Sequence, residues 1–167
     1  MPSVALCKLI ASAFVCGLLA GCASRIPPQL ASQVAWNLSF PDIRRQPEAY
    51  SGRVVALGGI VSHIDAVDEG YRVAVNELPL DGSSRHRPAV GQLPRGRFIV
   101  LIPRQGFPSD LRPGVEITVV GEIRGKGAAP EGLGTEELPL LDERYVQVWG
   151  PSWWPRFQIG VWGGIGI

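Results

Sequence analysis

Five segments of the chain have the hydrophobic patterning of β-strands. In VEITVVGEI, residues 115–123, apolar and polar side chains alternate, which predicts one side facing a core and the other facing solvent. RFIVLI, residues 97–102, is apolar throughout, as in a strand that is covered on both sides. The predicted strands are residues 53–64, 71–78, 97–102, 115–123 and 144–150. In the fourth strand, the core side is predicted to hold Val115, Ile117, Val119 and Ile123, and the solvent side Glu116, Thr118 and Glu122.

Turn-forming residues define how these strands are connected. DAVDEG, residues 65–70, joins the first two strands as a hairpin, and Pro113-Gly114 forms a turn before the fourth. Gly58-Gly59 falls in the middle of the first strand and predicts a bulge or a sharp bend there. Helical signals are short: Ser39 caps a helix that ends before Pro47. The pattern is typical of an all-β fold, a small OB-like barrel of five to six strands.

Composition agrees with this fold class and restricts the function. The 167 residues include 21 glycines and 15 prolines, which favours many turns, and 16 basic against 15 acidic side chains. The balanced charge gives no general attraction to nucleic acid or to acidic lipid. All three cysteines lie within the first 22 residues, so the predicted barrel has neither a disulfide framework nor a multi-cysteine metal site.

The amino-terminal segment has the features of a secretory signal. Lys8 precedes an apolar run, and the run from Leu9 to Ala23 is shorter than the roughly 20 residues that a membrane-spanning helix needs. Leu19-Ala20-Gly21-Cys22 resembles the lipobox of bacterial lipoproteins, in which the cysteine thiol receives a diacylglycerol and becomes the mature amino terminus. We favour lipidation of Cys22 over a plain secretory signal that happens to contain a cysteine. Ala23 and Ser24 follow, without the aspartate that favours retention in the inner membrane.

The chain divides into four predicted regions. Residues 1–21 are a lipoprotein signal peptide, and residues 22–35, with the lipidated cysteine and a Pro-Pro pair, are a tether. Residues 36–150 form the OB-like β-barrel domain. Residues 151–167 are an apolar, tryptophan-rich tail.

The chain resembles the Slp family, the starvation-associated outer membrane lipoproteins of Gram-negative bacteria. The resemblance implies an envelope lipoprotein of the outer membrane, facing the periplasm, with an OB-like domain and no established enzyme activity. Its partners would be the outer membrane, through the lipid anchor, and an envelope protein or lipopolysaccharide. The matching pieces run in order through the chain: Leu19 to Cys22, Pro47 to Gly52, Leu57 to Val61, Leu78 to Asp81, Gly96 to Phe98, Gly106-Phe107, Gly114 to Gly121 and Val146 to Trp149.

The residues themselves predict neither catalysis nor a metal or other cofactor. The chain has no G-x-S-x-G motif, and lipidation of Cys22 leaves the mature chain without a free thiol. His63 lies near three acidic side chains in HIDAVDE, but one imidazole among turn carboxylates is a poor metal site. Paired carboxylates such as Asp142-Glu143 are expected to be solvent-exposed, with ordinary pKa values.

An arginine-rich segment is the candidate ligand-binding region. Residues 82–114 contain six arginines against the single acid Asp110, and OB barrels often bind extended ligands over one strand face. An anionic glycan or lipid is one interpretation, and loops kept soluble by charge are the other; nucleic acid is not expected as a partner. The candidate residues are Arg85, Arg87, Arg95, Arg97 and Arg104.

The carboxyl-terminal tail is the candidate contact with a membrane or a partner. Four of the five tryptophans lie in the last nineteen residues, and the tail from residue 151 carries a single charge, Arg156. Such a segment either folds back over the barrel or docks onto a partner or the lipid surface. The candidate contact residues are Trp153, Trp154, Phe157 and Trp162.

Overall fold

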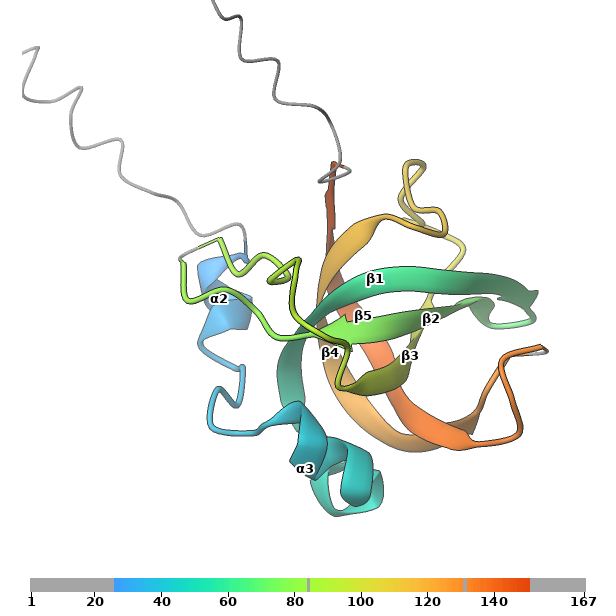
Figure 1. Cartoon of the computed structure of the whole chain (residues 1–167), viewed down its shortest axis with the longest axis horizontal. Coiled ribbons are helices and arrows are strands. Elements are labelled where there is room, and N and C mark those ends of the chain that lie inside the picture. The colour runs from blue at the N-terminus through green and yellow to red at the C-terminus, as the bar shows by residue number, and fades with distance from the viewer. Residues whose placement is uncertain (1–25, 84, 131, 151–167) are drawn as a thin grey trace, which may run out of the picture.

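The chain folds as a closed barrel of five strands (Figure 1). The structure, a computed structural model, describes residues 26–83, 85–130 and 132–150. Three short helical elements precede the barrel: α2 (Pro28–Ala31), α3 (Phe40–Arg45) and the 3₁₀ helix η1 (Pro47–Tyr50). The strands are β1 (Val54–Val67), β2 (Gly70–Leu78), β3 (Gly96–Ile102), β4 (Glu116–Ala128) and β5 (Glu137–Trp149). All five predicted strands are therefore confirmed, and a helix begins after Ser39 as predicted. The Ser39 side chain does not cap a backbone N–H of this helix, because its hydroxyl donates to the Asp42 carboxylate.

The strand order closes the barrel in the manner of an OB fold. Around the barrel the order is β1-β2-β3-β5-β4, and β4 pairs with β1 to close it. Four of the pairings are antiparallel, and β3 pairs with β5 in parallel, with Ile99 opposite Leu140. Such closure leaves no long unpaired strand edge. The prediction of an all-β OB-like barrel is confirmed, with five strands.

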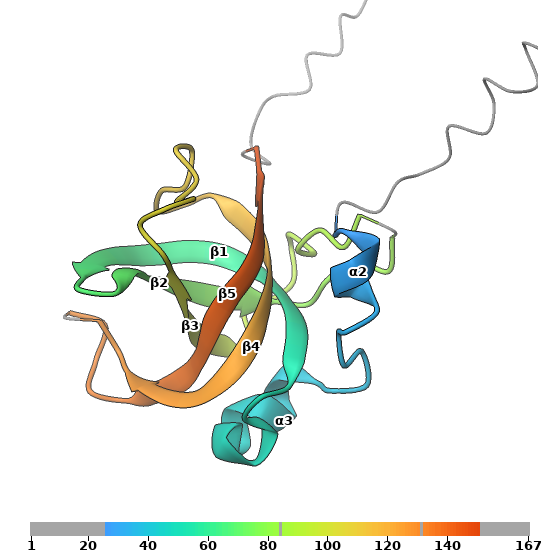
Figure 2. The ribbon, with the colours of Figure 1, turned by 180° about the vertical axis from the view of Figure 1, so that it is seen from behind.

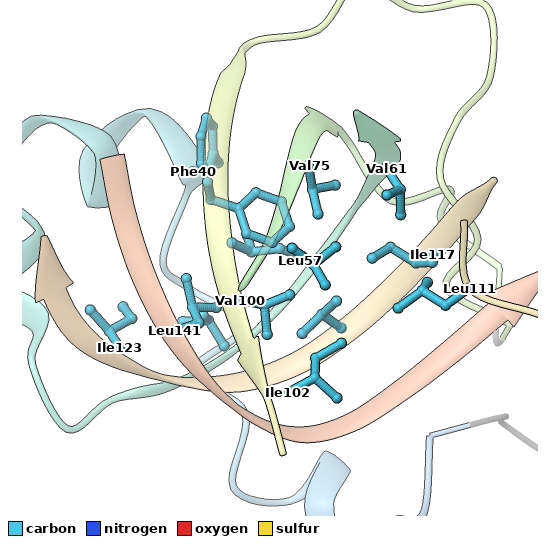
Figure 3. Close-up of a cluster of buried hydrophobic side chains, with 14 of the residues drawn as sticks. Phe40, Leu57, Val61, Val75, Val100, Ile102, Leu111, Ile117, Ile123 and Leu141 are labelled. Carbon is cyan, nitrogen blue, oxygen red and sulfur yellow. The ribbon is translucent and has the colours of Figure 1, made fainter. Parts of the chain in front are cut away.

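The core fills the barrel interior. Phe98, Val100 and Ile102 of β3 are buried there together with side chains from the other four strands (Figure 3). The predicted core side of β4 is also confirmed, since its apolar side chains are at most 4% exposed. Helix α3 closes one end of the barrel, because Phe40 and Ile43 belong to the same cluster.

The bulge in β1 does not lie at its glycine pair. The register against β2 shifts between Val61 and His63, which places the irregularity at Ser62. Gly58-Gly59 instead keeps a regular register, and the two glycines are needed for close approach. A β-carbon on Gly59 would lie 2.2 Å from the carbonyl oxygen of Asn76, and one on Gly58 would lie 2.5 Å from the Leu80 side chain.

The segment that was predicted to be a tether packs against the barrel from residue 26 onward. Ile26 is fully buried and Val34 is 7% exposed, and both contact Val120 on the outer side of β4. The Ala35 amide donates to the Val54 carbonyl at 2.8 Å. The expectation of a free tether therefore fails for residues 26–35, since a short apolar cluster holds them. Within the described residues, no helix is both long and apolar enough to cross a bilayer.

Candidate functional site

Two segments form a second layer over one side of the barrel, which we call the covering layer. It consists of residues 26–39 and of the β2–β3 loop, residues 79–83 and 85–95. Figures 1 and 2 show α2 beside this loop on one side of the barrel, with the β1–β2 turn on the opposite side. The indole of Trp36 stacks on the imidazole of His86 with ring centroids 4.8 Å apart. This contact joins the two parts of the layer.

A cleft of about 340 Å³ lies between the covering layer and the barrel. Its walls come from the segment after α2, from β1 and from both stems of the β2–β3 loop. The lining is mixed. It contains apolar side chains such as Leu38, Phe40 and Leu80 together with the charged pair Glu77 and Arg95. A concave site with an apolar lining and a few polar groups is the usual form of a ligand-binding site.

The charged pair in the cleft is built on the ends of two neighbouring strands. Glu77 lies on the same side of β2 as Val73 and Val75, and its side chain is only 1% exposed. Arg95 donates to both carboxylate oxygens, with its Nε 2.9 Å from Oε2. Arg44 of α3 in turn donates to the Arg95 carbonyl at 3.0 Å. The two-point arrangement satisfies a carboxylate that burial would otherwise destabilise.

A second buried carboxylate shows that the outer side of β4 is covered. Glu116 and Thr118, predicted to face solvent, are 2% and 0% exposed. The Arg87 Nε donates to Glu116 at 2.8 Å, and Thr118 donates to the His86 carbonyl at 2.6 Å. The indole N–H of Trp149 donates to the Thr118 hydroxyl at 2.9 Å. The prediction of a solvated face was wrong here because the β2–β3 loop folds over it.

The five candidate arginines do not form one surface. Arg87 and Arg95 bind the two buried glutamates, and Arg97 pairs with Glu136 and donates to the Leu133 carbonyl at 2.9 Å. Arg104 follows the opposite end of β3, where it donates to the Val67 carbonyl at 2.9 Å. Arg85 is exposed, next to His86 at the rim of the cleft. Three of the arginines are thus held by glutamates of this chain.

Two carboxylates outside the cleft have perturbed pKa values. Hydrogen bonds from Ser39 and Arg45 lower the pKa of Asp42. Burial raises the pKa of Glu143, and the neighbouring Arg144 partly offsets this. The expectation that this residue is fully solvated was therefore wrong. In the β1–β2 hairpin, His63 lies 2.6 Å from Asp65, whose other oxygen faces Arg72 at 3.5 Å. In the described part of the chain, no three or more His, Cys, Asp and Glu side chains are grouped as metal ligands.

Several residues of the cleft were not predicted from the sequence. Glu77, at the end of the second predicted strand, resembled an ordinary surface charge. Trp36 offered the only signal, because it is the one tryptophan outside the carboxyl-terminal cluster. His86 adopts a positive φ of 51°, an uncommon conformation for a side chain other than glycine, and it brings the imidazole against Trp36.

The remaining predicted sites lie outside the described residues. These are the lipidation site Cys22 and the tail residues Trp153, Trp154, Phe157 and Trp162. Both described ends of the chain adjoin the covering layer. Ile26 begins it, and Arg87 of the loop donates to the carbonyl of Gly150, the last described residue, at 3.1 Å.

Comparison with known proteins identifies the family. The model of the outer membrane lipoprotein Slp family matches residues 19–158, a range that begins at the first residue of the predicted lipobox and covers the whole barrel. No curated protein matches the sequence significantly. The family match agrees with the resemblance seen in the ordered sequence motifs. The chain belongs to the Slp family of outer membrane lipoproteins, and the outer membrane is its location.

Proposed function

We propose that the protein is a non-enzymatic scaffolding or binding lipoprotein that an acylated Cys22 anchors to the periplasmic leaflet of the outer membrane. The observation that carries this proposal is the family match, which starts at Leu19 and therefore includes the lipobox that ends at Cys22. The packing of Ile26, only four residues later, supports it further. The fold begins almost directly at the anchor.

The acyl chains of the proposed anchor would attach the protein to the bilayer lastingly. Each methylene that enters the bilayer contributes about 0.8 kcal/mol, and lasting attachment takes more than one chain. A cysteine that carries a diacylglycerol on sulfur and a third acyl chain on its amine meets this condition. With its sulfur in a thioether, Cys22 neither pairs with another thiol nor acts as a nucleophile.

Replacing Cys22 tests the anchor directly. Cys22→Ala is expected to abolish incorporation of labelled palmitate and to shift the protein from the membrane to a soluble fraction, because the thiol is the group that accepts the lipid. Cys16→Ala, within the predicted signal peptide, serves as the matched control and should leave both readouts unchanged. A wild-type protein whose mass equals that of its bare amino acids from residue 22 onward contradicts the proposal.

The described charges also support a role without catalysis. The two most buried carboxylates, Glu77 and Glu116, are each held by an arginine of the same chain, so neither is available as an unpaired acid or base. These pairs fix the path of the β2–β3 loop. The cleft that the loop borders is suited to holding a ligand or a segment of a partner.

A second candidate function is binding of an anionic envelope glycan or lipid. The observation that favours it is the cleft itself, which has Arg95 in its wall and the exposed Arg85 beside its rim. In this case Arg85→Glu should weaken retention on immobilised lipopolysaccharide about fivefold at low salt, and less at high salt. Arg112→Glu, in the exposed β3–β4 connection, is the control. Equal retention of both variants contradicts this function.

A further inference from the structure

We infer that the covering layer is the surface that faces the membrane, and that its exposed apolar side chains contact the phospholipid leaflet holding the Cys22 lipid. This inference rests on the proposed anchor and adds an orientation to it. The contact residues are Trp36, Val90 and Leu93. Three independent observations lead to this assignment: the length of the connection to Cys22, the distribution of apolar side chains and the distribution of charge.

The connection between anchor and barrel is short. Three residues, Ala23 to Arg25, separate Cys22 from Ile26, which is fully buried against the outer side of β4. Even fully extended, the four peptide steps span about 14 Å. Strand β1 alone has 14 residues, a contour of roughly 46 Å. This connection between Cys22 and Ile26 is therefore too short for the barrel to turn its far side toward the bilayer. The side of the barrel that carries Ile26 stays nearest to the bilayer.

Exposed apolar side chains gather on the same side. Among the described residues, the large hydrophobic side chains that are exposed are Trp36 at 49%, Val90 at 49% and Leu93 at 87%. All three belong to the covering layer. Residues 90–95 are exposed without interruption, and the sequence there is VGQLPR. The Trp36 ring is exposed while its N–H already donates to the Ala31 carbonyl at 3.1 Å, so contact with lipid leaves no indole donor unsatisfied.

Charge is scarce where the layer would meet lipid. Residues 26–41 contain no ionisable acid or base. In the loop, Arg87 and Arg95 pair with buried glutamates, and Asp81 accepts from the Arg87 amide and from Ser83. Exposed carboxylates lie elsewhere, including Asp68 and Glu69 in the β1–β2 turn on the opposite side of the barrel. Bringing the layer to a bilayer therefore desolvates few charges, whereas the opposite side would desolvate several.

These observations favour phospholipid over a protein partner as the surface that the covering layer contacts. The β2–β3 loop that carries Val90 and Leu93 also carries the exposed cation Arg85, and a segment with both basic and apolar exposed side chains suits a headgroup region with acyl chains below it. The short connection between Cys22 and Ile26 holds the covering layer next to the leaflet at all times. A protein partner would have to enter a gap of about 14 Å or less.

Site-specific fluorescence in vesicles tests the orientation. The mature acylated protein is reconstituted into phosphatidylethanolamine–phosphatidylglycerol vesicles, with a nitrobenzoxadiazole probe on Leu93→Cys, on Val90→Cys or, as the control, on Asp68→Cys in the β1–β2 turn. Acylation of Cys22 leaves the introduced thiol as the one that reacts. At residues 90 and 93, we expect emission to rise about threefold or more, with a blue shift and quenching by nitroxide-labelled lipids. At residue 68, we expect no change.

The outcomes separate this inference from the proposed anchor. A protein that does not float with the vesicles shows that the anchor has failed, independently of any probe. A protein that floats but whose Leu93 probe stays in water, or whose Asp68 probe is quenched instead, overturns the orientation. A blue shift at Leu93 that is the same without vesicles, or that grows with protein concentration, also overturns it, because the tail or a second copy then covers the surface.

Discussion

Arg95→Ala is expected to lower the free energy of unfolding by about 3 kcal/mol. The substitution removes both donors of a carboxylate that is 1% exposed, and an unpaired buried charge is among the costliest defects in a protein. The Arg95 side chain is itself 40% exposed, so water reaches part of the vacated space and keeps the loss near the lower end of the usual range. Thermal or urea unfolding of the mature chain with Cys22→Ala, followed by circular dichroism, measures the change.

Two further variants show whether the buried charge is the cause. Glu77→Gln combined with Arg95→Ala should recover part of the lost stability, because a neutral amide costs less to bury than a carboxylate. Arg45→Ala removes an arginine whose side chain is 76% exposed and whose partner Asp42 is also exposed, and it should change stability by less than about 1 kcal/mol. Equal losses for Arg95→Ala and Arg45→Ala, or no recovery in the double variant, contradict the interpretation.

Most of the barrel is predictable because its strands contain either continuous apolar runs or apolar positions that alternate with polar ones. Residues 115–123 repeat an apolar residue every second position, and the period alone identifies a strand and its core side. The first half of β5 was missed for a physical reason. Residues 137–143 read ELPLLDE, without alternation and with Pro139, which lacks a backbone N–H. Pairing with β4 nevertheless places this segment in the sheet, with Lys126 opposite Pro139.

The covering layer, and with it the cleft, could not be predicted, because the position of this layer depends on contacts between distant segments. Arg87 and Glu116 are 29 residues apart, and nothing in either local sequence distinguishes a paired side chain from a solvated one. Hydrophobic patterning reports which side of β4 faces the core, whereas burial of the other side depends on the path of the β2–β3 loop. The same holds for Ile26 and Val34, which in isolation resemble a linker and become buried only against Val120.

The family match and the fold support different parts of the functional account. Membership of the Slp family places the protein at the outer membrane, and the barrel shows how the described residues that follow the proposed anchor in the sequence are packed. The covering layer links the two, because it begins at Ile26 and contains the β2–β3 loop whose arginines hold Glu77 and Glu116. Defects in these pairs should therefore disturb both stability and the proposed membrane-facing surface.

Gly59→Ala is expected to destabilise the protein by about 3 kcal/mol or to prevent folding. The added β-carbon would lie 2.2 Å from the Asn76 carbonyl oxygen and 2.6 Å from a methyl group of Val75. The oxygen belongs to the backbone of the neighbouring strand, which the β1–β2 pairing holds in place, so the clash is relieved only by moving the strand.

At Gly58 the closest atom is a methyl group of Leu80, a side chain that can rotate, so Gly58→Ala should cost less. Gly82→Ala, with nothing within 4 Å, should change stability by less than about 0.5 kcal/mol. This order, measured by thermal unfolding, fails if Gly59→Ala is as stable as Gly82→Ala, and a strand pairing that tolerates the β-carbon would then replace the one described.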